Sequence, residues 1–309
     1  MNMSEPTNFL RGELSLDVDM SRHVSWRAGG RVARMYQAVD LADLALFLRT
    51  LPQDEPLLTV GLGSNLLVRD GGLRGTLLLT HGALTELHQE ADGLLYAQAG
   101  VPGAKLARFA ATHDLIGAEF CAGIPGTVGG MLAMNAGCYG SEIWDKVARV
   151  QVLTRAGELV ERTPADYAIG YRSVQRRDDD GEPFPLPTDE LFVGVWLKFE
   201  SGDGAASRLA IKTLLEKRVA SQPIGTPNAG SVFRNPAGDH AARLIESCGL
   251  KGCKIGGAEV SQKHANFIVN TGGATAADIE GLIERVQAEV AARTGIHLHP
   301  EIRIIGEKQ

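Results

Sequence analysis

The feature that most constrains this fold is a glycine-rich stretch between residues 122 and 140. It opens with Ala122-Gly123-Ile124-Pro125-Gly126-Thr127-Val128-Gly129-Gly130, which places four glycines in eight residues. Each glycine inside a helix or strand costs about 0.5–1 kcal/mol relative to alanine, because its unfolded backbone is unusually free. The composition therefore predicts a loop rather than a core element. From the residues alone, an unusual turn and bare backbone lying against a flat ligand explain it equally well.

A second glycine cluster, Gly61-Leu62-Gly63-Ser64-Asn65, follows a predicted buried strand at residues 57–60. Glycines let backbone N–H groups approach phosphate oxygens, and Ser64 and Asn65 add side-chain donors. The cluster is not a dinucleotide-binding fingerprint, because Leu66 replaces the third glycine and a second predicted strand follows instead of a helix. Since no GxxxxGK[ST] occurs, a P-loop is excluded. Taken alone, the cluster is either a tight turn or a phosphate cradle.

Three polar residues stand out in three other motifs. Ser231 follows a glycine in Asn228-Ala229-Gly230-Ser231-Val232-Phe233-Arg234-Asn235-Pro236, and Phe233 replaces the second glycine of a GxSxG nucleophile elbow. Arg172 lies in Tyr171-Arg172-Ser173, and Glu301 lies in an otherwise apolar segment at residues 298–305. Taken one at a time, each has an ordinary structural explanation: Ser231 as a turn serine, Arg172 as a surface arginine and Glu301 as a solvent-facing strand residue.

Composition excludes several classes of protein. The 309 residues are 44% hydrophobic with a net charge of -6, which is ordinary for a soluble globular chain. No apolar run approaches the roughly 18 residues of a membrane span, and residues 1–6 carry no apolar signal-peptide region. Four cysteines without CxxC spacing indicate reduced thiols in a cytoplasm. The scattered basic residues and the His and Cys spacings predict neither nucleic-acid nor metal binding.

The periodicity predicts an α+β fold. Helices are expected at 41–51, from Pro102, at 209–219 and at 276–293, where Thr275 and Asp278 form a capping box and Gly295 ends the helix. Strands are expected at 57–60, 66–68, 77–79, 94–97, 192–199 and 298–305, with a hairpin at 150–153 and 158–161. The acidic segment 178–190 is expected to be a solvated loop, and 201–204 a linker.

The order of these motifs along the chain resembles the UDP-N-acetylenolpyruvoylglucosamine reductases (UDP-N-acetylmuramate dehydrogenases). The resemblance begins at His23-Val24-Ser25-Trp26-Arg27-Ala28-Gly29-Gly30 and runs through GLGSN, AGIPGTVGG, IGYRS, PNAGSVFRNP, HANFIVN and HPEI. The chain resembles the branch without the extra tyrosine-bearing loop. It departs from the family pattern at Val24, Trp26 and Ala28, and its acidic loop is longer.

The resemblance implies an FAD-binding part of the vanillyl-alcohol-oxidase (PCMH) type in two subdomains, residues 1–76 and 77–203, followed by an α+β substrate-binding domain at 204–309. It also implies that Gly61, Leu62, Gly63, Ser64 and Asn65 hold the FAD pyrophosphate. The residues implied to line the flavin are Gly123, Ile124, Pro125, Gly126, Thr127, Gly129 and Gly130.

The implied reaction reduces UDP-N-acetylglucosamine enolpyruvate to UDP-N-acetylmuramate for peptidoglycan, and hence for cell-wall growth, cell shape and division. Hydride passes from NADPH to FAD and then from flavin N5 to C3 of the enolpyruvyl ether, while C2 takes a proton from Ser231. Arg172 and Glu301 are implied to stabilise the negative charge that builds on the substrate carboxylate. The residues expected to contact substrate are Tyr171, Arg218 and Asn235.

Two other functions stay open. One is an oxidase of the same fold acting on an alcohol or lactone, against which the Ser231–Glu301 pair speaks. The other is a non-catalytic nucleotide-sugar binding module, which would have no use for two flavin-type glycine loops. For the reductase we expect a cytoplasmic monomer whose partners are small molecules, with no metal.

Overall fold

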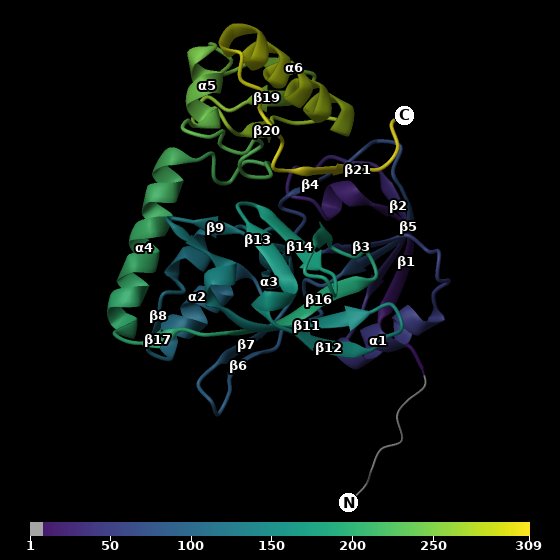
Figure 1. Cartoon of the computed structure of the whole chain (residues 1–309). Helices are drawn as coiled ribbons and strands as arrows, with labels where there is room; N and C mark the ends of the chain where they lie inside the picture. Colours follow the sequence, from purple (N-terminus) through teal and green to yellow (C-terminus); the bar gives the residue numbers. More distant parts are fainter. Residues whose placement is uncertain (1–8) are drawn as a thin grey trace, which may run out of the picture. The chain divides into compact units, whose positions relative to one another are not determined.

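A computed structural model describes residues 9–309 and divides the chain into two compact units. Unit 1 comprises the residues up to 15, 34–61 and 75–204, and unit 2 comprises 16–33, 62–74 and 205–309. Three of the boundaries between the units fall inside strands, so neither unit is one continuous stretch of the chain; the strands are labelled in Figure 1. These strands, β1 (Glu13–Asp19), β2 (Arg31–Gln37) and β5 (Leu73–Leu79), form a sheet with β3 (Leu57–Val60) in the order β1-β2-β5-β3. The expected lack of a signal peptide concerns residues outside those described.

Unit 1 is built on a five-stranded antiparallel sheet. Its order is β12-β11-β16-β7-β6, formed by Leu159–Arg162, Val147–Thr154, Glu190–Leu197, Leu95–Gln98 and Leu87–Gln89. Helix α1 (Leu41–Thr50) contributes Leu44, Phe47 and Leu48 to a buried cluster in this unit, and the Phe47 ring stacks on Tyr36 with centroids 3.7 Å apart. Burial of such side chains supplies about 1.5–3 kcal/mol each, so this cluster fixes α1 in the unit.

The other elements of unit 1 are short. They are α2 (Gly103–Thr112), α3 (Val128–Ala133), β8 (Leu115–Ile116), β9 (Gly137–Cys138), β10 (Ser141–Glu142), β13 (Tyr167–Gly170), β14 (Ser173–Arg177), β15 (Pro183–Pro185), β17 (Glu200–Ser201) and the 3-10 helices η2 (Glu119–Gly123), η3 (Ile143–Lys146) and η4 (Pro164–Asp166). Strands β13, β14 and β15 form a three-stranded antiparallel sheet, and β17 pairs with β8.

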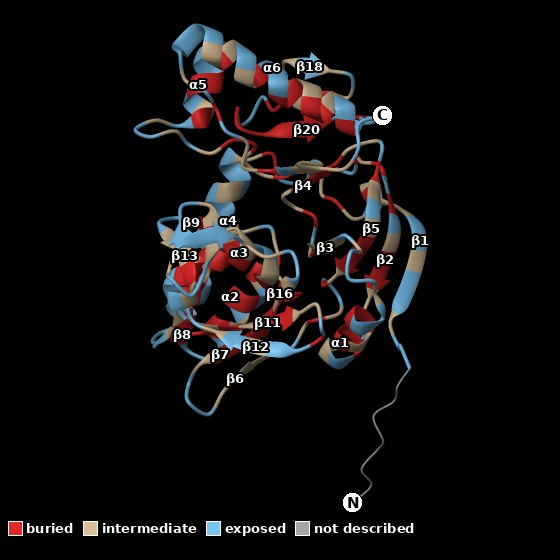
Figure 2. Ribbon diagram, turned by 45° about the vertical axis from the view of Figure 1, so that its right-hand side comes forward, coloured by how far each residue is buried: buried red, intermediate tan, exposed pale blue. Residues whose placement is uncertain are grey.

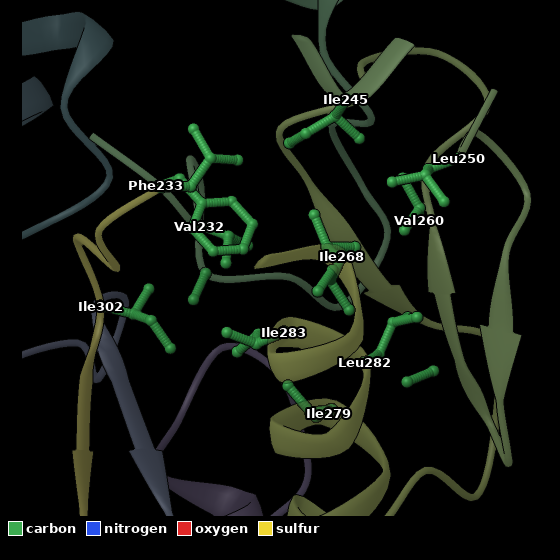
Figure 3. Packing of buried hydrophobic residues seen from close by; sticks show 14 of the residues in the cluster. Val232, Phe233, Ile245, Leu250, Val260, Ile268, Ile279, Leu282, Ile283 and Ile302 are labelled. Atoms are coloured by element: carbon green, nitrogen blue, oxygen red, sulfur yellow. The ribbon is translucent and has the colours of Figure 1, made fainter. Parts of the chain in front are cut away.

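Unit 2 packs two helices against a small antiparallel sheet. The elements are η1 (Met20–Arg22), β4 (Leu66–Val68), α4 (Gly204–Ser221), α5 (Ala241–Ser247), β18 (Lys254–Ile255), β19 (Ala258–Val260), β20 (Ile268–Asn270), α6 (Ala276–Thr294) and β21 (Arg303–Ile305). Strand β21 runs parallel to β4. Figure 3 shows Ile279, Leu282 and Ile283 of α6 packed with Ile268 of β20 and Phe233. Trp26 and Leu67, which precede this part of the chain by more than a hundred residues, belong to the same core.

The structure confirms the predicted α+β class and most predicted elements. Helix α6 has the predicted capping box, in which Thr275 accepts from the Asp278 N–H, and it ends at Gly295 with φ +72°. Its buried residues form one stripe along the helix, which is visible in red in Figure 2. Helices α1 and α2, strands β3, β4 and β7, and the β11–β12 hairpin lie within a few residues of where the sequence predicts them.

Three expectations are corrected. The glycine-rich stretch is not all loop, because α3 lies within it and buries Val128, Met131 and Leu132. The strand expected at 298–305 is reduced to β21; Pro300 has no N–H to donate to a ladder and makes only an isolated bridge to Phe233. The acidic loop contains β15, whose prolines are tolerated at the edge of its sheet.

Candidate functional site

The turn at residues 62–65 presents a run of backbone donors. Among the described residues, the N–H groups of Leu62, Gly63, Ser64 and Asn65 donate to no acceptor. Gly63 has φ +60°, and a Cβ on it would overlap the carbonyl oxygen of His23, so only glycine fits here. Consecutive backbone N–H groups of this kind can bind an anion.

Gly61, which precedes this turn, belongs to unit 1 and has a different role in the structure. A Cβ on Gly61 would overlap Oγ1 of Thr127. The packing of Thr127 against the backbone therefore requires the glycine, whatever ligand the chain binds.

Ser25 is a candidate binding residue that sequence reasoning missed. Its backbone N–H donates to the Gly63 carbonyl at 3.1 Å, so it lies against the turn. Its hydroxyl is buried and, within residues 9–309, has no hydrogen-bond partner. A buried hydroxyl without a partner costs roughly 1–3 kcal/mol, which a ligand oxygen at that place would offset. The only sequence signal was its place in the motif at residues 23–30.

In the glycine segment at residues 122–130, several backbone N–H groups donate to carbonyls of the protein itself. The N–H groups of Val128 and Gly129 donate to Val101 and Ala99, each at 2.9 Å. Thr127 is buried and forms an isolated bridge with Pro102.

The remaining predicted flavin residues lie at the end of η2, in the segment between η2 and α3, and in α3 itself. The N–H of Ile124 donates to the Cys121 carbonyl, that of Gly126 donates to the Ile124 carbonyl, and Pro125 lies between them. A Cβ on Gly123 would lie 2.8 Å from Cys138 Sγ, so side-chain packing requires this glycine. Gly130 differs, because a Cβ there would meet nothing within 4 Å. Open space beside bare backbone is suited to a flat ring.

Cys121 is the buried thiol of this segment. Burial raises its pKa far above the ordinary value, so the thiolate is disfavoured.

Ser231 and Glu301 are brought to one place in unit 2. Gly230 precedes the serine with φ +76°, and its N–H donates to Asn228 Oδ1 at 2.9 Å. After the serine, the Val232 carbonyl accepts the N–H of Glu301 at 2.7 Å. The backbone of the candidate acid is thus hydrogen-bonded to the residue next to the candidate proton donor.

Asn266 fixes the segment that follows Ser231. Its carbonyl accepts the Val232 N–H at 2.9 Å, and its side chain both accepts the Phe233 N–H at 2.9 Å and donates to the Phe233 carbonyl at 2.8 Å. Asn266 is buried, so these three bonds hold the backbone of Val232 and Phe233 in place. Asn266 belongs to the HANFIVN motif, but nothing in the sequence identified its partners.

Arg172 lies in unit 1 at the two-residue turn between β13 and β14. It adopts φ +52°, a strained conformation for a non-glycine residue. Its guanidinium donates to the carbonyls of Asn135 and Gly137 at 3.3 and 2.7 Å, while Asn135 donates back to Gly170 at 3.0 Å. These bonds fix the turn. The exposed side chain of Tyr171 lies beside the guanidinium, with its ring centroid 5.4 Å from Arg172 Cζ.

The other two predicted substrate residues have local partners. Arg218, near the end of α4, donates to Gln222 at 2.9 Å. Asn235 accepts the N–H of Ala241 at 3.1 Å and so satisfies a donor at the start of α5.

Within residues 9–309 there is no group of three or more His, Cys, Asp or Glu side chains that could hold a metal ion. In the same part of the chain, no helix has both the length and the apolar character of a membrane span.

The fold and these sites define an FAD-binding oxidoreductase. The free N–H groups of 62–65 and the Ser25 hydroxyl fit a diphosphate, and the open backbone at Gly130 fits a flat ring. Residues 32–163 match the family described as FAD binding domain. The fold is similar to 6-hydroxy-D-nicotine oxidase from Arthrobacter nicotinovorans, with a TM-score of 0.53 at 13% identity over 96% of this chain and 90% of that one. That likeness supports the vanillyl-alcohol-oxidase type of FAD-binding fold.

More similar proteins identify the family. Residues 222–305 match the family described as UDP-N-acetylenolpyruvoylglucosamine reductase, C-terminal domain. The reductase of that name from Thiobacillus denitrificans is 56% identical, over 97% of this chain and 94% of its own. The crystal structure of the enzyme from Thermus caldophilus superposes with a TM-score of 0.79 at 29% identity, over 96% of this chain and 99% of that one. The chain belongs to the UDP-N-acetylenolpyruvoylglucosamine reductase family, as the resemblance in sequence implied.

Proposed function

We propose that this FAD enzyme uses NADPH to reduce UDP-N-acetylglucosamine enolpyruvate to UDP-N-acetylmuramate, as a cytoplasmic monomer. Addition of hydride to C3 and of a proton to C2 turns the enolpyruvyl ether into a lactyl ether, and NADPH becomes NADP⁺. Bound FAD would supply the hydride transfer between NADPH and the substrate. The observation that most supports the proposal is the hydrogen bond from the Glu301 N–H to the carbonyl of Val232, the residue that follows Ser231.

Cofactor binding falls to the two glycine segments. The N–H groups of 62–65 and the Ser25 hydroxyl hold the diphosphate oxygens, because within residues 9–309 they are donors without partners. The residues that line the ring are Gly123, Ile124, Pro125, Gly126, Thr127, Gly129 and Gly130. Gly61 shapes the backbone that leads into the turn.

Three residues act on the enolpyruvyl group. Arg172 binds the carboxylate, where its permanent charge stabilises the negative charge that grows as C3 gains hydride. Glu301, protonated, donates to the same oxygens. Ser231 gives its hydroxyl proton to C2: the O–H bond breaks, the C2–H bond forms, and water returns a proton to the serine oxygen.

Three residues outside this centre contact the rest of the substrate. Tyr171 contacts the substrate, and Arg218 and Asn235 bind the nucleotide diphosphate, for which Arg218 supplies positive charge. We place this binding on the part of the chain from residue 204 onward, together with Tyr171 of the β13–β14 turn.

The direct test measures NADPH consumption by the FAD-loaded protein with and without UDP-N-acetylglucosamine enolpyruvate, both under nitrogen and in air. Oxidation that depends on the substrate, with one UDP-N-acetylmuramate formed per NADPH, is the expected result. Slow oxidation that is unchanged by the substrate and depends on oxygen would contradict the proposal and favour an oxidase. A protein that binds no flavin would contradict the cofactor assignment as well.

A further inference from the structure

The side chain of Asn65 is directed at the backbone of Glu301. Its amide nitrogen donates to the Glu301 carbonyl oxygen at 3.2 Å. The main chain beside it is held as well, since the Arg303 N–H donates to the Asn65 carbonyl at 3.1 Å and β4 pairs with β21 from Leu66 onward. Asn65 is therefore both the last residue of the anion-binding turn and a direct partner of the candidate acid.

The opposite side of Glu301 is also fixed. Its N–H donates to the Val232 carbonyl at 2.7 Å, and the preceding Pro300 forms a bridge with Phe233. Glu301 lies two residues before β21 (Arg303–Ile305). The Asn65 amide and the Val232 carbonyl together bind both polar groups of the Glu301 backbone.

We infer that Asn65 is a positioning residue for Glu301, an inference that rests on the function proposed above. Its amide orients the backbone from which the acid projects toward the substrate carboxylate. Because the same residue ends the turn at 62–65, the acid and the diphosphate site are positioned by one piece of backbone. Asn65 acts on the reaction through Glu301, not by contact with the substrate.

If Asn65 only binds the cofactor, its replacement should have other effects than if it positions Glu301. If Asn65 only held FAD, its loss would weaken FAD binding and would slow both half-reactions through lower occupancy. If it positions Glu301, its loss at saturating FAD slows substrate reduction and leaves flavin reduction by NADPH unchanged. The two half-reactions can be measured separately by stopped flow.

The test is a double-mutant cycle on the full-length, FAD-loaded enzyme. Asn65→Asp keeps the size but replaces the donor with an acceptor, and Asn65→Ala removes both. Each is combined with Glu301→Ala, and the reoxidation of reduced flavin by UDP-N-acetylglucosamine enolpyruvate is followed in a single turnover. We expect either Asn65 change to slow this step about tenfold when Glu301 is present and less than twofold when Glu301 is already alanine. The FAD dissociation constant, from flavin fluorescence, is measured for every variant.

Ser64→Ala is the matched comparison, because Ser64 lies in the same turn. It is expected to weaken FAD binding and, at saturating FAD, to leave the ratio of the two half-reactions unchanged. An equal slowing by Asn65→Asp with and without Glu301 would overturn the inference while leaving the proposed function intact. If Glu301→Ala itself does not slow substrate reduction, the assignment of the acid in the proposed function fails, and the inference fails with it.

Discussion

At the scale of single residues, the proton-donor role proposed for Ser231 predicts different effects of its loss on the two half-reactions. Ser231→Ala is expected to leave flavin reduction by NADPH within about twofold of wild type, since no proton of this serine is used there. Transfer of a proton to C2 loses its donor, and general-acid groups contribute typically 10²–10⁴-fold. Rapid-mixing measurements of each half-reaction check this directly.

Ser247→Ala is a suitable control for that experiment. The Ser247 hydroxyl is exposed at the end of α5 and donates to the Leu244 carbonyl at 2.8 Å. Both half-reactions should stay at the wild-type rate in this variant. An equal loss of both half-reactions in Ser231→Ala would show that the serine supports the structure instead of donating the proton.

The buried hydroxyl of Ser25 leads to a second prediction at the scale of single residues. Without FAD, Ser25→Ala is expected to unfold in urea at the same concentration as wild type or higher, because the buried hydroxyl has no hydrogen-bond partner in the described part of the chain. At a concentration 100 times the wild-type dissociation constant, FAD adds about 2.7 kcal/mol to the free energy of unfolding. If the variant binds FAD tenfold more weakly, about 1.4 kcal/mol of that gain is lost. An unchanged gain would exclude Ser25 from the cofactor site.

Motif residues were found from the sequence more readily than their partners. Ser231, Arg172 and Glu301 are visible as polar residues in short motifs, whereas the contacts that hold them join distant segments. Asn65 and Glu301 are separated by 236 positions, and Trp26 donates to Ile268 across 242 positions. No local pattern of hydrophobicity or spacing encodes such a pairing, so only the folded structure could show it.

At the scale of elements, helix α6 depends on a cap from outside its own sequence. The carboxylate of Asp70 accepts the N–H groups of Ala276 and Ala277 at 3.0 and 2.8 Å, which adds to the capping box of Thr275. Asp70→Ala is expected to lower the free energy of unfolding by about 1–2 kcal/mol, as loss of a helix cap does. Asp70→Asn keeps one acceptor and should lose less. Urea unfolding of both variants is the measurement, and equal stability of Asp70→Ala and wild type would show that the box alone suffices.

The same helix carries an ion pair whose strength depends on pH. Glu280 is buried and bonded to Arg69 at 2.9 Å, and this bond lowers the pKa of the carboxyl below its ordinary value. A lowered carboxyl pKa stabilises the fold above the unfolded pKa and loses that effect as pH falls through the folded one. Glu280→Gln is therefore expected to cost about 1–3 kcal/mol at pH 7, with the difference shrinking below about pH 5. A difference that is constant from pH 7 to pH 3 would contradict this.

Strongly periodic elements were predicted well, and irregular ones were not. Helix α6 was recognised because its apolar stripe, capping box and terminal glycine all agree. Helix α3 was missed because three buried side chains, Val128, Met131 and Leu132, stabilise a turn and a half that glycine content alone argues against. The strand expected at 298–305 was too long because alternation does not register the missing donor of Pro300. In each case tertiary contacts outweighed local propensity.

At the scale of the whole molecule, unit 2 needs segments from the first quarter of the chain. Trp26 and Leu67 are fully buried in its core, and Trp26 Nε1 donates to the Ile268 carbonyl at 2.8 Å. Asn270 donates back to the Trp26 carbonyl at 2.9 Å, and β21 has β4 as its partner. Each large buried apolar side chain contributes about 1.5–3 kcal/mol, so two of them approach the entire stability of a small domain.

A fragment of residues 204–309 is therefore expected not to fold alone. Without Trp26, Leu67 and β4 it should show no cooperative urea transition and little dispersion of amide NMR signals. Co-expression with a fragment of residues 1–203, which supplies the missing segments, should restore both. The single variants Trp26→Ala and Leu67→Ala test the same dependence in the intact chain. Each change should lower the free energy of unfolding by about 2–5 kcal/mol. A sigmoidal transition of the isolated 204–309 fragment would show that its helices and β18–β20 sheet suffice, and that the early segments are added to a unit already folded.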